Sequence, residues 1–487
     1  MNLSHFENKN IHIVGVSGAE GSAVAEFLTD NLREAKITAH DFCQEKDFKK
    51  SFYSFHDAYD EEEKAELFEK LSNLPIKFHF KAEYLKDIEQ ADLIFVPQSW
   101  FRYQENKKLL ALADKTPFYN ITKLYFTLCP CPIVAVTGTS GKSTTTRLIY
   151  EILRQGEKKV WLTGNDRQNV QVLSEIAKMS SKDIMVMEVS NRQLKIDLGK
   201  SPQVAVITNI TPNHLDDHKD YADYIAAKQN LLKYQSNQDF VVLNHDNEVT
   251  RQFAAKSKAS LYLFSQREEL TKGCYVKQGS IYLNDGDSEH KICSVNDIIL
   301  PGPHNISNVL AAAMASFLLG VSTKHIREIT TSYQGLPSRL EFVREINKVK
   351  YYEDSSSCNP DGTRAAIKSF KNPLILIAGG SRKAKMPDEY QQLAEDVAKS
   401  KIKVLLLIGE EGLSIEEAIR QEFAKQGISR MLIKQCSDLA EAVDNAHTAS
   451  DPGDVVVLSP GCESFGMFKD YRDRGRQFKK LVGALSE

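Results

Sequence analysis

Short apolar runs rich in Val and Ile recur along this 487-residue chain, and stretches with helical spacing of apolar positions separate them. Strands that are buried on both faces give continuous apolar runs, and alternation with helices is typical of parallel sheets covered by helices. The pattern therefore predicts an α/β fold with mainly parallel sheets. The runs are IHIVGV (11–16), DLIFVP (92–97), PIVAVTG (132–138), DIMVMEVS (183–190), VAVITNI (204–210), FVVLNHD (240–246), LILIAGG (374–380), VLLLIG (404–409) and VVVLSPG (455–461).

The order of these runs predicts three domains. Residues 1–128 open with a strand, the glycine turn GVSGAEG and a helix, which is typical of a Rossmann-like domain. Residues 129–335 contain the loop TGTSGKST after a buried strand, which predicts a central parallel sheet of P-loop ATPase type. Residues 336–487 hold three further buried-strand patterns, and we expect a second Rossmann-like domain there.

Composition excludes several classes of partner. The chain has 62 basic and 65 acidic residues and a formal net charge of −3, so no excess charge favours nucleic acid or an anionic membrane surface. The run VLAAAMASFLLGV is shorter than the ~18 apolar residues that a membrane span needs. The start MNLSHFENKNIHIVGV lacks a signal-peptide pattern. We expect a cytoplasmic monomer that acts on small molecules.

Eight cysteines are scattered along the chain and do not form a disulfide framework. The sequence CPC at Cys129–Cys131 is compatible with a metal or redox site. However, no second Cys/His pair follows at zinc spacing, so ordinary buried thiols are the preferred interpretation.

The stretch AVTGTSGKSTTT (135–146) carries the clearest chemistry. It stands between an apolar strand and a helix, where backbone N–H groups and a helix N-terminus bind phosphate oxygens. In such loops the lysine, here Lys142, reaches the terminal phosphates, and Ser143 or Thr144 faces Mg²⁺. Val136 stands where the general pattern has its first glycine. The loop predicts nucleotide binding and leaves the phosphate acceptor open.

Three downstream segments add polar candidates. Glu188 ends an apolar strand, where a carboxylate can hold Mg²⁺ against phosphates. TNITPNHLDDH (208–218) brings His214 close to acidic residues, which suits a metal ligand, a general base or an ordinary loop. Lys228 lies on an amphipathic helix, where a lysine is normally solvated. Each residue taken alone leaves these alternatives open.

The motifs in their order resemble the Mur ligases, the ATP-dependent amide ligases of peptidoglycan precursor synthesis. The resemblance covers residues 91–487, and within the family the chain is most similar to the members that add D-glutamate. It rests on TGTSGKST, EVS, TNITPNHLD, AAK, GPHNISNVLAA, SRLEF, DSSSCNP, IAGG and LSPGCESFGMFKDYRDRGRQF.

The resemblance implies an activity and its cofactors. In this family ATP phosphorylates a substrate carboxylate, and the amine of an amino acid attacks the acyl phosphate to give an amide, ADP and phosphate. It implies ATP and Mg²⁺ as cofactors and a UDP-sugar precursor and an amino acid as substrates. The implied reaction adds D-glutamate to UDP-N-acetylmuramoyl-L-alanine. The resemblance further implies that the N-terminal domain binds the nucleotide sugar, the central domain binds ATP and the C-terminal domain binds the amino acid.

The resemblance also implies the site residues. The ATP site comprises Gly138, Thr139, Ser140, Gly141, Lys142, Ser143, Thr144, Asn305, Asn308, Arg339 and Asp354. The implied metal ligands are Ser143, Glu188, His214 and Lys228, the last of which the family often carbamylates. Catalysis is assigned to Lys142, Glu188, His214 and Lys228. The substrate residues are Asn165, Ser190 and Gln193 for the nucleotide sugar, and Lys383, Ser464 and Tyr471 for the amino acid.

The match departs from the family in the segment DSSSCN (354–359), where D-glutamate-adding members typically have DSKATN. Ser356 replaces a charged donor and Cys358 replaces a hydroxyl with a weakly donating thiol. The identity of the amino acid therefore stays open. Alternatives are a Mur-like ligase with another amino acid or acceptor, a P-loop kinase or NTPase, and a non-catalytic relative that binds nucleotide.

Overall fold

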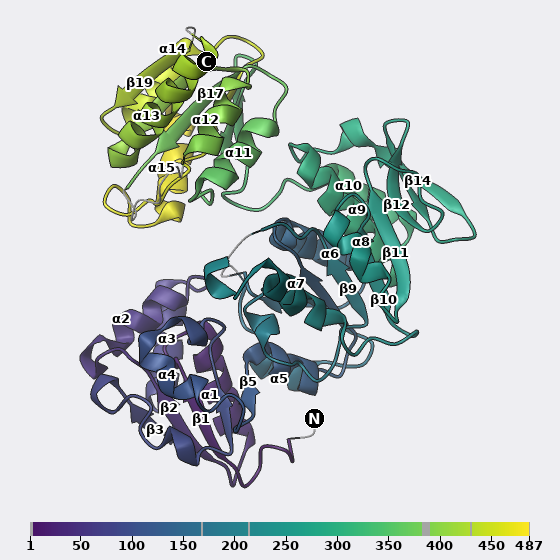
Figure 1. The fold of residues 1–487 in the computed structure, drawn as a ribbon, viewed down its shortest axis with the longest axis vertical. Helices are drawn as coiled ribbons and strands as arrows, with labels where there is room; N and C mark the ends of the chain where they lie inside the picture. Colours follow the sequence, from purple (N-terminus) through teal and green to yellow (C-terminus); the bar gives the residue numbers. More distant parts are fainter. Residues whose placement is uncertain (1–2, 167–168, 213–214, 382–389, 429–430, 487) are drawn as a thin grey trace. The chain divides into compact units, whose positions relative to one another are not determined.

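The structure is a computed structural model that describes residues 3–166, 169–212, 215–381, 390–428 and 431–486. Its strands form three mainly parallel sheets with helices between them, which confirms the predicted α/β class (Figure 1). The chain forms two compact units, residues 1–297 with 307–331, and residues 298–306 with 332–487. The first unit contains two of the sheets and the second unit contains the third.

The first sheet is parallel and has the strand order β3-β2-β1-β4-β5. Its strands are β1 (Asn10–Val14), β2 (Lys36–His40), β3 (Lys77–His79), β4 (Leu93–Phe95) and β5 (Phe118–Tyr119). The helices of this part are α1 (Ala19–Asn31), α2 (Phe48–Phe55), α3 (Glu61–Ser72), α4 (Lys107–Leu110) and α5 (Ile121–Leu128). Helix α3 begins at a capping box in which Asp60 accepts from the Glu62 and Glu63 backbones.

The second sheet has the order β14-β13-β12-β11-β10-β9-β6-β8-β7. Strands β6 to β12 pair in parallel, and β12, β13 and β14 form an antiparallel extension. The strands are β6 (Ile133–Thr137), β7 (Val160–Gly164), β8 (Ile184–Glu188), β9 (Val204–Ile207), β10 (Phe240–Asn244), β11 (Ser260–Ser265), β12 (Gly273–Lys277), β13 (Ser280–Asn284) and β14 (Glu289–Ser294). The helices are α6 (Lys142–Gln155), α7 (Tyr221–Gln229), α8 (Glu248–Ala254), α9 (Pro303–Leu318) and α10 (Thr323–Ser332).

The third sheet has the order β15-β16-β20-β17-β18-β19, in which only the β15–β16 pair is antiparallel among the described strands. The strands are β15 (Glu341–Ile346), β16 (Val349–Glu353), β17 (Leu374–Gly379), β18 (Ile402–Ile408), β19 (Leu432–Cys436) and β20 (Val455–Leu458). The helices are α11 (Pro360–Lys368), α12 (Gln391–Ala398), α13 (Gly409–Gln426), α14 (Leu439–Ala449) and α15 (Tyr471–Ala484).

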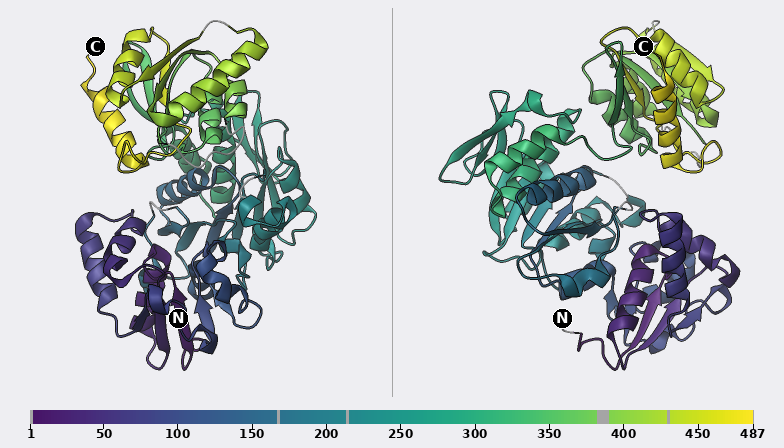
Figure 2. Two further views of the ribbon diagram at one scale, coloured as in Figure 1. Left: turned by 60° about the vertical axis from the view of Figure 1, so that its left-hand side comes forward. Right: turned by 180° about the vertical axis from the view of Figure 1, so that it is seen from behind.

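Apolar clusters explain why these runs become buried strands. In the third sheet, alternate residues of β17, such as Ile375 and Leu376, belong to two clusters on opposite faces. Helices α14 and α15 cover one face and α11 to α13 cover the other (Figure 2). In the first unit a single cluster runs from Phe6 to Phe253 and includes residues of both sheets. The first and second sheets therefore share one hydrophobic core.

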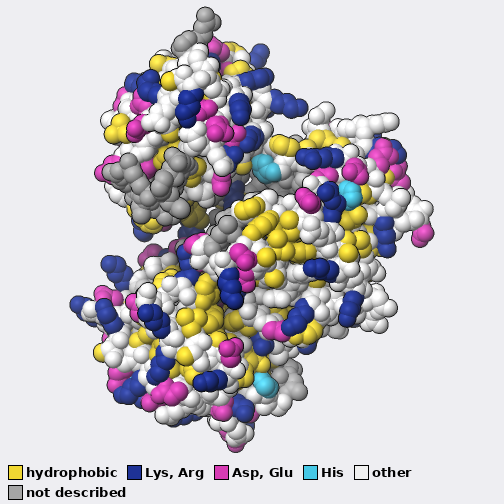
Figure 3. All heavy atoms as spheres, viewed as in Figure 1, with side chains coloured by type: hydrophobic (Ala, Val, Ile, Leu, Met, Phe, Trp, Pro, Cys, Tyr) yellow, Lys and Arg dark blue, Asp and Glu magenta, His cyan; other side chains and the backbone are white. Residues whose placement is uncertain are grey.

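The surface carries charges of both signs, and Figure 3 shows basic and acidic side chains interspersed over the visible face. Within the described part of the chain, no helix is long and apolar enough to cross a membrane.

Candidate active site

The phosphate loop lies between β6 and α6, at the carboxyl edge of the second sheet. Gly138 and Gly141 adopt positive φ angles of 152° and 83°. A Cβ on Gly138 would lie 2.0 Å from Thr208 Oγ1, and one on Gly141 would lie 2.2 Å from Asn308 Oδ1. Both positions therefore require glycine, because a side chain would clash with the neighbouring loop or helix.

Residues that follow β9 hold this loop in place. The Thr139 backbone N–H donates to Asn209 O at 2.8 Å, and the Ser140 N–H donates to Asn209 Oδ1 at 3.0 Å. The Thr208 hydroxyl donates to Ser140 O at 2.6 Å. Sequence reasoning did not assign Thr208 or Asn209 to the site. Their signal is the segment TNI, which ends the strand beside β6 and so reaches the same edge.

Two lysines contact the loop. Lys142 Nζ donates to Thr139 O at 3.0 Å, and Lys228 Nζ donates to Gly138 O at 2.7 Å. Lys228 comes from α7 and has 1% of its surface exposed, with Nζ 4.9 Å from the centre of the Tyr224 ring. Burial, reinforced by the charge of Lys142, lowers the pKa of Lys228 well below its ordinary value, while Glu188 opposes the shift. A solvated helix lysine, the ordinary interpretation of its pattern, is therefore wrong here.

Glu188 ends β8 beside the loop and has 3% of its surface exposed. Its Oε1 accepts from Asn165 Nδ2 at 3.0 Å. Its Oε2 is buried and has no hydrogen-bond partner among the described residues. A buried carboxylate oxygen without a donor is costly unless a cation pairs with it. Glu188 therefore fits a Mg²⁺ site, and the buried hydroxyl of Ser143 supplies a second hard oxygen near the same edge.

The acidic segment after β9 has a structural explanation for most of its residues. Asp217 is buried and forms ion pairs with Arg192 at 2.7 Å and Arg102 at 2.8 Å. His218 Nδ1 lies 2.8 Å from Asp223 Oδ2. Burial lowers the pKa of His218, so its ring favours the neutral form. His214, which the resemblance assigns to the metal, lies outside the described residues.

Two of the predicted nucleotide-sugar residues, Ser190 and Gln193, belong to one hydrogen-bond network, whereas Asn165 contacts Glu188. Gln193 Oε1 accepts from the Ser190 N–H at 2.9 Å, and the Ser190 hydroxyl donates to Gln98 Oε1 at 2.9 Å. Gln193 Nε2 donates to Glu20 Oε1 at 2.9 Å. Glu20 lies in the first turn of α1, after the glycine turn of the first sheet, and its enclosure raises its pKa to about 7. Gln98 and Glu20 were missed from sequence, since no local pattern connects them with Gln193.

Asp354 follows β16 at the carboxyl edge of the third sheet. Its Oδ2 accepts from the Ser357 hydroxyl at 2.6 Å and from the Ser459 hydroxyl at 2.7 Å. Burial raises the pKa of Asp354 to about 7 despite these hydrogen bonds. Arg339 is exposed in the same unit, and Asn305 Nδ2 donates to Pro301 O at 2.8 Å.

The unusual segment DSSSCN packs against a buried arginine. Arg474 of α15 has no exposed surface, and its Nη2 donates to Ser355 O at 3.0 Å. The same nitrogen lies 3.7 Å from Cys358 Sγ. The predicted amino-acid residue Ser464 is buried, and Tyr471 is half-buried at the start of α15. Lys383 lies outside the described residues.

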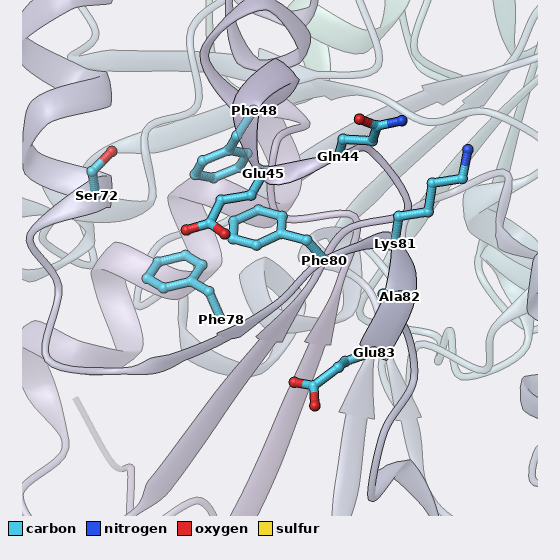
Figure 4. Close-up of a pocket in the computed structure, with 9 residues that line it drawn as sticks. All are labelled: Gln44, Glu45, Phe48, Ser72, Phe78, Phe80, Lys81, Ala82 and Glu83. Carbon is cyan, nitrogen blue, oxygen red and sulfur yellow. The ribbon is translucent and has the colours of Figure 1, made fainter.

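A separate cavity of about 780 Å³ lies beside β3 in the first unit. Figure 4 shows the rings of Phe48, Phe78 and Phe80 grouped on one side of it. None of the described residues that line it is a predicted site residue. The chemistry described above therefore lies elsewhere, at the carboxyl edges of the second and third sheets.

Comparisons with known proteins identify the family of this chain. The family model of the Mur ligase middle domain matches residues 136–316, and that of the Mur ligase glutamate ligase domain matches residues 338–462. The UDP-N-acetylmuramoylalanine–D-glutamate ligase of Acetivibrio thermocellus is 40% identical over 98% of this chain and 97% of its own. The enzyme of the same name from Clostridium kluyveri is 41% identical over 83% of this chain and 85% of its own.

Two solved structures share the fold. A pseudomurein peptide ligase type C from Methanothermus fervidus has a TM-score of 0.56 at 18% identity, covering 98% of this chain and 100% of its own. The UDP-N-acetylmuramate–alanine ligase MurC from Thermotoga maritima has a TM-score of 0.56 at 16% identity, covering 98% of this chain and 99% of its own. At these identities the likeness concerns the fold alone.

Proposed function

This chain belongs to the Mur ligase family of ATP-dependent amide-bond ligases, and we propose that it adds D-glutamate to UDP-N-acetylmuramoyl-L-alanine in peptidoglycan precursor synthesis. Support comes from relatives with that name that are 40% and 41% identical over most of this chain. Members of the family use ATP and Mg²⁺.

The reaction has to make a carboxylate reactive toward an amine. Phosphoryl transfer from ATP to the carboxylate of the acceptor gives an acyl phosphate, the amine of D-glutamate attacks its carbonyl, and phosphate leaves. We assign the binding of the terminal phosphates to the backbone of Ser140 and Gly141 and to Lys142. A preformed loop suits this role, because its donors need no rearrangement when charge develops. When bound, Mg²⁺ would neutralise charge on the phosphate oxygens.

One observation carries the proposal: a buried carboxylate oxygen without a hydrogen-bond donor and a buried lysine both lie beside the phosphate loop. The oxygen is Glu188 Oε2, and the lysine is Lys228, whose Nζ contacts Gly138 O at 2.7 Å. A site that only held a phosphate would not need the carboxylate. We therefore assign Glu188 and Ser143 to the metal, together with His214.

We further propose that Lys228 is carbamylated. Its burial and its lowered pKa favour the neutral amine, which is the form that attacks CO₂. The neutral nitrogen forms a bond to the carbon of CO₂ while one C–O π bond opens, and the nitrogen loses one proton, so a neutral amine becomes a carboxylate-like anion. An anion there would serve as a metal ligand and would remove the repulsion between Lys228 and Lys142.

The remaining assignments follow the family resemblance. Gly138, Thr139, Thr144 and Asn308 join the ATP site, and we assign the nucleotide sugar to Asn165, Ser190 and Gln193. Asn308 Oδ1 accepts from Thr145 at 3.3 Å, next to the loop. For the second unit we propose that Asn305, Arg339 and Asp354 bind ATP and that Lys383, Ser464 and Tyr471 bind the amino acid. We also propose that the protein is a cytoplasmic monomer with an N-terminal nucleotide-sugar domain (1–128), a central ATP domain (129–335) and a C-terminal amino-acid domain (336–487).

A phosphate-release assay tests the proposed function. UDP-N-acetylmuramoyl-L-alanine, ATP and Mg²⁺ are supplied with D-glutamate, L-glutamate, D-aspartate, L-lysine or glycine in separate reactions. We expect phosphate release that depends on both the acceptor and D-glutamate. Turnover with another amino acid and none with D-glutamate would overturn the substrate assignment. Release with ATP alone would favour an NTPase.

A further inference from the structure

Two cysteines stand side by side where the first sheet's last helix leads into the second sheet. Cys129 follows α5, and its N–H donates to Tyr125 O at 2.8 Å. Cys131 precedes β6, the strand that ends in the phosphate loop. The two Sγ atoms lie 3.2 Å apart, and Cys129 Sγ lies 3.5 Å from Cys131 O. The two thiols thus lie against each other across Pro130.

The two thiols have different surroundings. Cys131 has 6% of its surface exposed and belongs to the shared apolar cluster. Cys129 is half-buried at the edge of that cluster. The hydrogen bond between them lowers the pKa of Cys129, with a smaller contribution from the positive charge of Lys200, and raises the pKa of Cys131. The more accessible sulfur is therefore the one that ionises first.

A metal site does not account for this pair. Two thiols supply two ligands, and the described residues contain no group of three His, Cys, Asp or Glu side chains placed to hold a metal ion. A structural zinc site uses four ligands as a rule. The contact between two sulfurs is instead the arrangement that a thiol and its resolving partner require, because a disulfide places the sulfurs about 2.05 Å apart.

We propose that Cys129 and Cys131 form a reversible intrachain disulfide when the protein meets a hydroperoxide, with Cys129 as the attacking thiol and Cys131 as the resolving thiol. This inference is independent of the proposed ligase activity.

The chemistry balances in two steps. The Cys129 thiolate attacks one oxygen of hydrogen peroxide, the O–O bond breaks, hydroxide leaves and a sulfenic acid forms on Cys129. Cys131 sulfur then attacks the sulfenic sulfur, the S–O bond breaks, and the hydroxyl leaves as water with the proton of Cys131. Two thiols and one peroxide give one disulfide and two waters. A dithiol reductant reduces the disulfide by thiol–disulfide exchange and restores both thiols.

Cys43 and Cys358 provide internal controls because both are half-buried free thiols. Burial and the neighbouring Asp41 raise the pKa of Cys43 to about 12. Burial likewise raises the pKa of Cys358. Neither has a second cysteine within its own three-residue stretch. We therefore expect both thiols to react slowly with peroxide under conditions that oxidise Cys129.

The test is mass spectrometry of the full-length folded protein after brief treatment with hydrogen peroxide. We expect the intact mass to fall by two hydrogen atoms, the peptide map to place the bond between Cys129 and Cys131, and dithiothreitol to restore the mass. Reaction at Cys43 and Cys358 should be at least ~10-fold slower. A disulfide elsewhere, or overoxidation of Cys129 without a disulfide, would overturn the proposal.

Two serine variants test the order of attack. In Cys131→Ser, Cys129 should accumulate a sulfenic acid that dimedone captures, because the resolving thiol is missing. In Cys129→Ser, dimedone labelling of Cys131 should fall at least ~10-fold below that level. Equal labelling of both variants would contradict the assigned roles. Thermal unfolding curves that match the parent protein establish that each variant is folded.

Discussion

Gln193 Nε2 donates a hydrogen bond of 2.9 Å to Glu20 Oε1, and this contact links the edge of the second sheet to the first helix of the first sheet. Gln193 also accepts from Ser190, so one amide connects the glycine turn with the predicted substrate residues. The carboxyl of Glu20 has a pKa of about 7 because its surroundings penalise the charged form.

This shift predicts the effect of Glu20→Gln on stability. The folded protein holds the Glu20 proton up to about pH 7, whereas an unfolded chain loses it near 4.5, so the free energy of unfolding falls as pH rises between these values. The variant should reduce the total fall in the free energy of unfolding over this pH range by on the order of 1 kcal/mol, since Glu20 keeps some solvent contact. Urea unfolding between pH 5 and pH 8 measures the slope. Glu66→Gln, at an exposed position of α3, should leave it unchanged.

Glu188→Gln should weaken Mg²⁺ binding and leave the stability of the fold nearly unchanged. Removing the charge weakens Mg²⁺ binding, so the Mg²⁺ concentration for half-maximal phosphate release should rise at least ~10-fold. Folding should change little, because a neutral amide is less costly to bury than a carboxylate with an unpaired oxygen. Asp183→Asn, at the opposite end of β8, is the control. Asp183 accepts from Trp161 and Ser180, so its loss should lower stability and leave the Mg²⁺ dependence intact.

Lys228→Ala should reduce phosphate release by roughly 10²- to 10³-fold, because the proposed anion next to the phosphate loop is lost. ¹³C NMR with labelled bicarbonate should show a carbamate signal in the parent protein and none in the variant. Lys233→Ala removes an exposed lysine that pairs with Asp197 and should keep both activity and signal. A carbamate signal of equal size in Lys228→Ala would refute carbamylation at this site.

Cys358→Thr tests the departure in DSSSCN. A hydroxyl is a stronger hydrogen-bond donor than a thiol, and one added bond of about 1 kcal/mol would lower KM for D-glutamate about five-fold. The KM for ATP should stay unchanged. Cys436→Thr, in β19, serves as the control. An unchanged KM for D-glutamate in Cys358→Thr would show that this side chain does not contact the amino acid.

The buried histidines His12 and His40 predict acid lability of the first sheet. His12 Nδ1 lies 2.8 Å from His40 Nε2, and the ring of His79 stacks on His40 with centroids 5.4 Å apart. Burial lowers the pKa of His12 to about 4 and that of His40 to about 3. The unfolded chain therefore binds more protons at His12 and His40 below about pH 6.5, and stability falls as pH drops below that value by up to ~1.4 kcal/mol per pH unit for each of these two groups.

Replacing His40 with Gln should reduce this loss of stability at low pH. The free energy of unfolding in urea, measured from pH 7.5 to pH 5, should fall less steeply in the variant than in the parent protein. His325→Gln, in α10, should retain the parent slope. If the free energy of unfolding fell equally steeply with decreasing pH in His40→Gln and in the parent protein, the role assigned to the buried ring would be contradicted.

Local patterns in the sequence predicted the α/β class and the phosphate loop. Strand–helix alternation needs only neighbouring residues, and Gly138 and Gly141 supply the positive φ angles of the loop within one short motif. Glu188 was found for a related reason, since a carboxylate directly after an apolar strand lies at the sheet edge in any parallel sheet.

The sequence by itself determined the elements, the nucleotide loop and the family resemblance, because each is written in consecutive residues. Only the tertiary structure decided that Lys228 is buried under the loop, that one oxygen of Glu188 lacks a donor, and that Glu20 meets Gln193. These properties depend on the strand order that places β8, β6 and β9 side by side and on the apolar cluster that contains residues of both the first and the second sheet. Burial and charge pairing arise from such distant contacts, and no local spacing specifies them.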